Sequence, residues 1–235
     1  MKGCKMKILS LNLNRNENLQ SIKNEAQVDI YAFQESKIQL TGRTRINTIN
    51  IVDSAIKKEK LLEFEKIWNK FFPWLEFPEN YFAESEIDYE SFPFILINVH
   101  LAGFRSELRQ LLMFVLLKRL NAEDLKFKNI ILVGDFNAER VHGTATKQGL
   151  KGSRYLDEII KIGFEELKTE NENLDDVKTF YDANKIGHRY DHAFIKYKEE
   201  NTSYQIKVKY FPEENKTWFS DHRGIILEIE KNLLR

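Results

Sequence analysis

The apolar residues of this chain fall into short runs that are separated by polar and charged segments. Runs of this length are typical of buried β-strands, and they predict strands over 7–13, 28–34, 92–101, 130–134, 190–197, 203–211 and 224–230. Other segments carry apolar residues at helical spacing and predict helices over 17–27, 105–120 and 153–162. Strand–helix units come first and consecutive strands come last, which indicates a packed α/β or α+β fold.

Residues 36–91 give the weakest pattern. Within them, apolar and aromatic residues follow helical spacing and predict a helix over 57–72. The aromatic and acidic stretch 74–92 could stack on bases or sugars. Aromatic rings more often pack into the core, and we expect core packing here. A later acidic run, 165–176, is expected to be a solvated face.

Composition limits the classes of protein that fit. The chain has 235 residues, of which 42% are hydrophobic and 31% are charged. This length and composition suit one substantial domain over 1–235. Lysine and arginine (36) balance aspartate and glutamate (36), so bulk charge alone does not hold nucleic acid, although a local basic rim stays open. Cys4 is the only cysteine, so no intrachain disulfide can form. The sequence shows no signal-peptide or transmembrane pattern, and we expect a cytoplasmic protein.

The most informative run is IILVGDFNA at 130–138. A buried strand ends in glycine, and Asp135 and Asn137 follow two positions apart, so on an extended backbone both side chains project in one direction. A carboxylate and an amide held together at a strand end suit a hard divalent cation, or a phosphate beside one. The alternative is an ordinary strand followed by an Asx turn.

Other apolar runs also end in side chains with oxygen or imidazole groups. These residues are Asn12, Gln34, Glu35, Asn98, His100, Asp191, His192, Asp221 and His222. One such residue is usually a cap or a turn, whereas their recurrence predicts convergence on a single site. The oxygen ligands favour Mg2+ or Mn2+ over zinc, and the chain has no cysteine cluster. The histidines would then move protons or hold phosphate, with Asp191 available to orient His222.

These residues stand within the motifs LSLNLN, AFQESK, INVHLAG, LVGDFNA, RYDHAFI and FSDHRGI. The motifs resemble, in order, those of the endonuclease/exonuclease/phosphatase superfamily, and they extend from Asn12 to His222. The resemblance implies the deoxyribonuclease-I-like fold, a four-layer α/β/β/α sandwich in which two packed mixed sheets are flanked by helices. The site would lie at one end of the two sheets.

The resemblance also implies a metal site. By matching motif, Glu35 is similar to the main metal ligand of the family, supported by Asn12 and Asp221, and the cofactor would be Mg2+ or Mn2+. Asp135 and Asn137 resemble the pair that orients the attacking water and the phosphate, or that holds a second metal. The implied reaction is in-line attack of water on a phosphoester, with the metal neutralising developing charge.

Two histidines receive roles from the same resemblance. His222 resembles the histidine that contacts the scissile phosphate and assists proton transfer, with Asp191 orienting its ring. His100 resembles the second histidine, a candidate acid for the leaving group. His192 points to the opposite face of its strand from Asp191 and is expected to be a packing residue. Asn98 is given the same interpretation.

Basic residues flank the motifs. They are Lys37, Arg43, Arg45, Arg105, Arg109, Arg140, His142, Lys147, Lys151, Arg154, Lys185, His188, Arg189 and Arg223. A basic rim around a metal site would suit a polyanion, with Arg105 and Arg109 as candidate contacts to the substrate phosphate. The alternative is that loops of a highly charged chain carry charge anyway. Arg105 or Arg109 would then only cap the helix over 105–120.

We expect a metal-dependent phosphodiesterase and favour an endo- or exonuclease on DNA, because the run at 34–37 is similar to the Gln-Glu-Thr-Lys motif of abasic-site endonucleases. The segments after Asn12 and Asn137 differ from those enzymes, so the substrate stays open. One alternative is a phosphatase or phosphodiesterase on a phosphoinositide, a sphingolipid or a small nucleotide, for which residues 71–82 could contact a lipid surface. The least favoured is a catalytically silent binding module, because the acidic and histidine residues of the motifs are intact.

Overall fold

The computed structural model describes residues 5–14, 19–35, 39–40, 43–44, 48–51, 56–59, 61–78, 81–89, 92–103, 105–139, 150–169, 177–198, 204–212 and 220–231. Its helices are α1 (Leu19–Ala26), α2 (Leu61–Phe71), α3 (Ser106–Leu120) and α4 (Leu150–Lys161), with a 3-10 turn at Glu123–Leu125. None of the helices in these ranges is long and apolar enough to cross a lipid bilayer.

The longer strands form two mixed sheets. The first sheet has the order β14 (Tyr204–Phe211), β15 (Gly224–Lys231), β1 (Lys5–Asn12), β2 (Ile30–Gln34) and β5 (Thr48–Ile51). The second has the order β10 (Glu165–Glu166), β13 (Asp191–Lys196), β9 (Asn129–Asp135), β8 (Phe94–His100), β7 (Phe82–Ile87) and β6 (Ile56–Glu59). Two short hairpins pair β3 (Gln39–Leu40) with β4 (Arg43–Thr44), and β11 (Phe180–Tyr181) with β12 (Gly187–His188).

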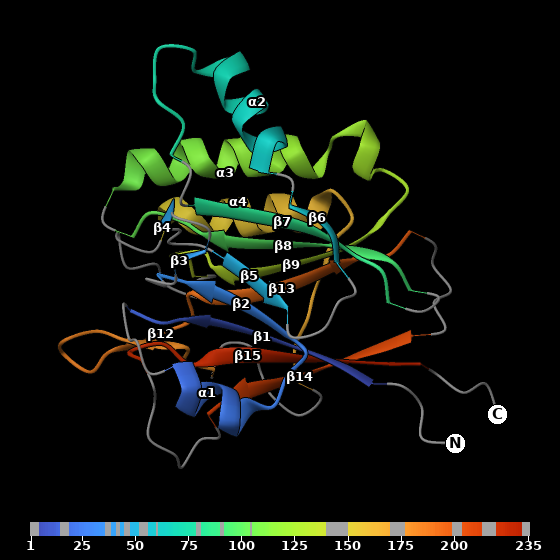
Figure 1. The fold of residues 1–235 in the computed structure, drawn as a ribbon. Coiled ribbons are helices and arrows are strands. Elements are labelled where there is room, and N and C mark those ends of the chain that lie inside the picture. The colour runs from blue at the N-terminus through green and yellow to red at the C-terminus, as the bar shows by residue number, and fades with distance from the viewer. Residues whose placement is uncertain are drawn as a thin grey trace.

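The two sheets pack face to face, and helices lie on both outer faces (Figure 1). Along β1, Ile8 faces the second sheet while Leu9 and Leu11 face α1, as the two-residue alternation of a strand requires. On the outer face of the second sheet, Leu112 and Leu116 of α3 pack into the core that this sheet forms with α2, α3 and α4. The four-layer α/β/β/α sandwich predicted from the sequence is therefore confirmed.

Parallel strand pairs bring the polar strand ends to one place. In the first sheet β1 runs parallel to β2, with Asn12 opposite Gln34. In the second sheet β8 runs parallel to β9, with His100 opposite Asp135. Because parallel strands end at the same edge of a sheet, the polar residues at these ends gather at one edge of the sandwich.

A buried amide pair joins the two sheets next to this edge. Gln34 Nε2 donates to Asn98 Oδ1, and Asn98 Nδ2 donates to the carbonyl of Phe33, 3.0 Å away. Both amide side chains are completely buried. Asn98 is therefore a packing residue, as predicted, and its amide supplies hydrogen bonds inside the interface between the sheets.

The glycine before Asp135 is required by the neighbouring strand. Gly134 has a φ of +136°, and a Cβ at this position would lie 2.0 Å from the carbonyl oxygen of Val99 on β8. No side chain fits such a gap, and L-residues rarely adopt this φ. Glycine thus allows β9 to approach β8 closely one residue before the site.

Two acidic residues are buried, and one of them, Glu166, lies in the run that was expected to be solvated. Glu166 of β10 is 8% exposed, and its Oε1 lies 2.8 Å from both Arg189 Nη2 and His192 Nδ1. The solvated face predicted over 165–176 is therefore wrong at this residue, because basic partners compensate for the burial of the carboxylate. Glu84 of β7 is buried in the same way, since Arg119 Nε and Nη2 donate to it at 2.8 and 2.7 Å.

The segment 36–91 contains strands that the sequence pattern does not predict. The predicted helix over 57–72 is α2 preceded by β6, and β7 lies within the aromatic and acidic stretch 74–92. Phe82 and Phe92 are buried as expected, whereas Trp74 is 75% exposed on the turn after α2. The expectation of core packing therefore holds for part of this stretch and is wrong for Trp74.

Candidate active site

Both sheets contribute side chains to the edge where the parallel strands end. Asn12 ends β1, Glu35 follows β2, His100 ends β8, Asp135 ends β9, Asp191 begins β13, and His222 precedes β15. Asp191 lies directly opposite Asp135 in the antiparallel pairing of β13 with β9. The convergence that the sequence predicts for these residues is what the structure contains.

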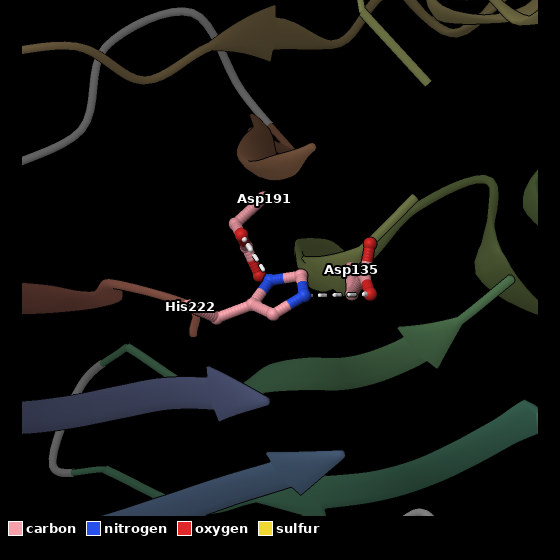
Figure 2. A group of neighbouring side chains, drawn as sticks. All are labelled: Asp135, Asp191 and His222. Carbon is pink, nitrogen blue, oxygen red and sulfur yellow. Dashed lines mark hydrogen bonds and ion pairs between the residues drawn. The ribbon is translucent and has the colours of Figure 1, made fainter. Parts of the chain in front are cut away.

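The ring of His222 lies between two buried carboxylates (Figure 2). Its Nδ1 is 2.9 Å from Asp191 Oδ2, and its Nε2 is 3.8 Å from Asp135 Oδ2. Burial lowers the pKa of His222, but the negative charges of Asp191 and Asp135 together outweigh this effect and raise the pKa to about 10. His222 is therefore a cation at neutral pH, held at Nδ1 by Asp191.

Asp135 is fixed by amide donors on both oxygens. Its Oδ1 accepts the backbone N–H of Asn137 at 2.8 Å, and its Oδ2 accepts Asn137 Nδ2 at 2.9 Å and Asn12 Nδ2 at 3.0 Å. Asn137 has a φ of +46°, which turns its amide back toward Asp135 and which asparagine tolerates. The Asx turn considered from the sequence is thus present, and it forms part of the site. Burial raises the pKa of Asp135.

Glu35 and His100 lie opposite each other beside Asp135. His100 Nε2 is 3.3 Å from Glu35 Oε1 and 3.9 Å from Asp135 Oδ2, and Asn12 Nδ2 is 3.4 Å from Glu35 Oε1. The hydrogen bond with His100 lowers the pKa of Glu35 more than burial raises it. The side chain of Glu35 is 27% exposed, so the structure presents an ionised carboxylate that solvent can reach. The ring of Tyr81 covers His100 at a centroid distance of 5.9 Å.

Asp221 directly precedes His222 and contributes a negative charge that helps to raise the pKa of His222. Its side chain is exposed and accepts a hydrogen bond from Ser220 Oγ at 3.1 Å. Among the described residues, no hydrogen bond or ion pair joins Asp221 to Glu35 or Asn12. Asn12 directs its amide nitrogen toward Glu35, and its Oδ1 accepts the backbone N–H of Asn14 at 2.9 Å.

The two arginines proposed to contact phosphate differ in their surroundings. Arg109 Nη1 donates to the carbonyls of Ala102 and Gly103 at 3.0 and 2.6 Å, so it fastens the loop that follows β8. Arg105 stands at the N-terminal end of α3, is exposed, and makes no side-chain capping hydrogen bond. Arg105 is thus the arginine that stays available to a ligand.

Within the part of the chain that the structure describes, three basic residues of the predicted rim have internal partners. His188 Nδ1 lies 3.2 Å from Glu139 Oε2, Arg189 is bound by Glu166, and Arg223 Nε donates to the carbonyl of Pro212 at 3.0 Å. Arg189 is buried by its partner, His188 and Arg223 are half-buried, and Arg154 and Lys185 are exposed. The side chains of Lys37, Arg43, Arg45, Arg140, His142, Lys147 and Lys151 lie outside the described residues.

Aromatic rings beside His222 were not predicted as site residues. The ring of Phe180 lies 4.8 Å from that of His222 and 5.3 Å from that of Tyr190, and Tyr190 stacks on His188 at 5.0 Å. Phe180 also pairs with His222 in an isolated β-bridge. The β11–β12 hairpin that carries Phe180 and His188 is too short to give a strand pattern in the sequence.

His192 faces away from this group. Its Nδ1 and Nε2 lie 2.8 Å from Glu166 Oε1 and from the carbonyl of Ala138, respectively, and the ring is completely buried. A histidine with both nitrogens bound in the interior serves packing, as predicted for it.

Solved structures share this architecture over nearly the whole chain. The 3'-5' exonuclease NExo from Neisseria meningitidis matches with a TM-score of 0.65 and 15% identity, over 96% of this chain and 100% of that one. The endonuclease domain of TRAS1, a telomere-specific non-LTR retrotransposon, matches with a TM-score of 0.64 and 16% identity, over 98% and 100%. An endonuclease/exonuclease/phosphatase family protein from Bacteroides thetaiotaomicron matches with a TM-score of 0.59 and 15% identity, over 99% and 100%.

The chain has the deoxyribonuclease-I-like fold. No protein-family model and no curated protein sequence matches it. The solved structures named above are 15–16% identical to this chain, so the similarity lies in the fold. The fold implied by the six sequence motifs is thus confirmed by structure.

Removing the charge of Asp191 is expected to lower the pKa of His222. In Asp191→Asn, the pKa should move from about 10 toward the ordinary value of 6.5. NMR titration of the His222 ring protons measures it, and an unchanged pKa would contradict the assignment. Since folding raises this pKa, the pair stabilises the wild type fully below pH 6.5 and loses its contribution as pH rises toward 10. Thermal unfolding of the variant should depend less on pH across that window.

Proposed function

We propose that this protein is a divalent-metal-dependent phosphodiesterase that cleaves DNA as an endo- or exonuclease. The observation that carries the proposal is the convergence of Glu35, His100, Asp135, Asp191 and His222 at one edge of the sandwich. A cation, ionised carboxylates and amide donors meet there, as hydrolysis of a phosphoester requires. NExo, one of the structures with the same fold, is a 3'-5' exonuclease.

The donor atoms fit a hard divalent cation, Mg2+ or Mn2+. Glu35 supplies an ionised carboxylate that solvent reaches, and we propose it as the main ligand. Asn12 and Asp221 stay proposed ligands, Asn12 from a buried position and Asp221 from an exposed one. Asp135, Asp191 and His222 also lie close together, with donor atoms within 4.8 Å of one another, but a protonated His222 has no free lone pair, so we assign the metal to the Glu35 side of the site. A bound cation would neutralise charge that develops on the phosphoryl oxygens.

His222 would bind the scissile phosphate as a cation. Asp191 holds Nδ1 at 2.9 Å, so Nε2 is the nitrogen that points toward Asp135 and the reacting group. The imidazolium stabilises negative charge on a phosphate oxygen and can donate its Nε2 proton there. Because Asp191 fixes the ring, His222 pays little rotational entropy when substrate binds.

Asp135 and Asn137 would orient the attacking water. The amide donors of Asn12 and Asn137 fix the plane of the Asp135 carboxylate. Burial raises the pKa of Asp135, and its carboxylate would accept a hydrogen bond from the attacking water. His100, on the opposite side of Asp135, would protonate the leaving oxygen from Nε2, which lies 3.3 Å from Glu35.

Two features support a nucleic-acid strand as the substrate. The ring of Phe180 stands beside His222 and stacks on Tyr190, so a base or a sugar could stack on this aromatic group next to the bound phosphate. Arg105 and Lys185 are exposed and could contact neighbouring phosphates. Arg109 would act indirectly, by holding the loop after β8. We further propose that residues 1–235 form one catalytic domain and that the protein acts in the cytoplasm.

A lipid or inositol phosphate is the second candidate substrate, and one observation favours it. Phe71, Trp74 and Leu75 are exposed together at the end of α2, with exposed fractions of 36%, 75% and 40%. Tryptophan with neighbouring apolar side chains is typical of surfaces that contact the membrane interface. The substrate tests therefore include vesicles.

The test is hydrolysis in Mg2+ or Mn2+ of plasmid DNA, single-stranded DNA, an abasic duplex, RNA, and vesicles that contain phosphoinositide or sphingomyelin. We expect DNA cleavage that EDTA abolishes and that Glu35→Gln lowers by about 10²-fold or more. Glu65→Gln makes the same chemical change on the exposed face of α2 and should keep full activity.

Other outcomes would contradict the DNA proposal in different ways. Phosphate release from vesicles alone would assign the lipid substrate. If the protein hydrolyses none of these substrates but binds a metal that Glu35→Gln no longer binds, it would be a binding module. Cleavage that survives Glu35→Gln would refute the metal site.

A further inference from the structure

A buried threonine next to the site bonds to the segments that carry Asp191 and His222. Thr179 is completely buried and directly precedes β11. Its Oγ1 accepts the backbone N–H groups of Tyr190 and Asp191, both at 3.0 Å. A hydroxyl oxygen has two acceptor positions, and these two amides occupy both.

The backbone of Thr179 binds two further segments. Its N–H donates to the carbonyl of His188 at 2.8 Å, and its carbonyl accepts the N–H of Arg223 at 2.7 Å. Arg223 is the residue after His222, and Phe180, the residue after Thr179, pairs with His222 in a β-bridge. Thr179 therefore holds the segment of Asp191 through its side chain and the segment of His222 through its backbone.

The position of Asp191 depends on these bonds. On one side Asp191 pairs with Asp135 of β9, and on the other its N–H is bound by Thr179. The distance of 2.9 Å between Asp191 Oδ2 and His222 Nδ1 requires both backbones to keep their places. Loss of the Thr179 hydroxyl would take the acceptor from the buried N–H of Asp191 and from the part-buried N–H of Tyr190, and the strand start would shift to satisfy them.

We propose that Thr179 is a positioning residue, whose hydroxyl fixes Asp191 so that Asp191 can orient His222. This inference rests on the proposed hydrolase function for its effect on rate. It acts through Asp191 and needs no contact between Thr179 and the substrate. Outer residues that orient a catalytic group commonly change activity by about 10–100-fold when they are removed.

Thr179→Val tests the hydroxyl, because valine keeps the shape and lacks the acceptor. We expect kcat to fall by about 10–100-fold with KM nearly unchanged. Thr179→Ser restores the acceptor and should stay within about threefold of wild type. Amide hydrogen exchange should become faster at Tyr190 and Asp191 in the valine variant, while Phe194 in the middle of β13 keeps its protection.

Circular dichroism and thermal unfolding show whether the valine variant folds, and Thr179→Ala provides the same loss of acceptor if it does not. A kcat within twofold of wild type in a folded valine or alanine variant would overturn the inference. So would a serine variant as slow as the valine variant, because the shape of threonine would then matter and its hydroxyl would not. If wild type hydrolyses no phosphoester, the proposed function fails, whereas the exchange rates at Tyr190 and Asp191 still decide whether Thr179 holds this strand start.

Discussion

Replacing His222 with alanine is expected to lower kcat for phosphodiester hydrolysis by about 10³-fold. The change removes an imidazolium that is held between Asp191 and Asp135, at 2.9 and 3.8 Å. It also leaves two buried carboxylates without the positive charge between them, so the site would bind a phosphate dianion or diester less well. The measurement is steady-state cleavage of the best DNA substrate at saturating metal, with Asp191→Asn assayed beside it.

Asp191→Asn should cost less than His222→Ala, because the ring stays and only its charge partner is lost. If the His222 side chain acts as a cation and a proton donor, imidazole added to the His222→Ala protein should recover part of the hydrolysis rate. Activity of His222→Ala within tenfold of wild type would show that this histidine does not serve the reaction. A purified wild-type sample that EDTA does not inhibit would instead point to a contaminating enzyme.

Replacing Gly134 with alanine is expected to destabilise the fold by about 3 kcal/mol or more. The new Cβ would meet the carbonyl oxygen of Val99 at 2.0 Å, and that oxygen belongs to the backbone of the neighbouring strand. β9 would therefore have to move away from β8, at the centre of the second sheet. Urea unfolding followed by circular dichroism gives the change in the free energy of unfolding.

Gly163→Ala is the matched control. Gly163 also has a positive φ, of +95°, but a Cβ there meets only the flexible Lys196 Cε at 3.8 Å. This variant pays the conformational cost alone, about 1 kcal/mol. Equal losses at Gly134 and Gly163 would contradict the close approach of β9 to β8.

The elements that the sequence predicts well are those whose pattern reflects burial directly. β9, β13 and β15 each contain three or more consecutive apolar residues that pack between layers, and their bounds agree with the prediction within two residues. β7 was missed because Glu84 interrupts its apolar pattern. Only the structure shows that Arg119, distant in the chain and on α3, neutralises this buried carboxylate.

The residues of the site could be chosen from sequence because their types and motifs are unusual, and parallel pairing of strands brings them together. The exact hydrogen-bond and ion-pair partners of these residues could not be predicted from the sequence. Arg109 binds loop carbonyls and Asp221 faces solvent, and such outcomes depend on side-chain conformations that no local pattern encodes. Thr179 gave no signal at all, because a threonine before a short hairpin is common and its value comes from bonds to residues 188, 190, 191 and 223.

The order of strands in the first sheet has a consequence for synthesis of the protein. β1 lies between β2 and β15, so the first described strand gains one of its two neighbours only when residues 224–231 have left the ribosome. His222 leaves just before them. Until then the nascent chain has an open strand edge for chaperones to cover and lacks its cationic group. A product that stops short of this strand would therefore keep an open edge at β1 and would lack His222, so it is expected to be less stable than the full chain.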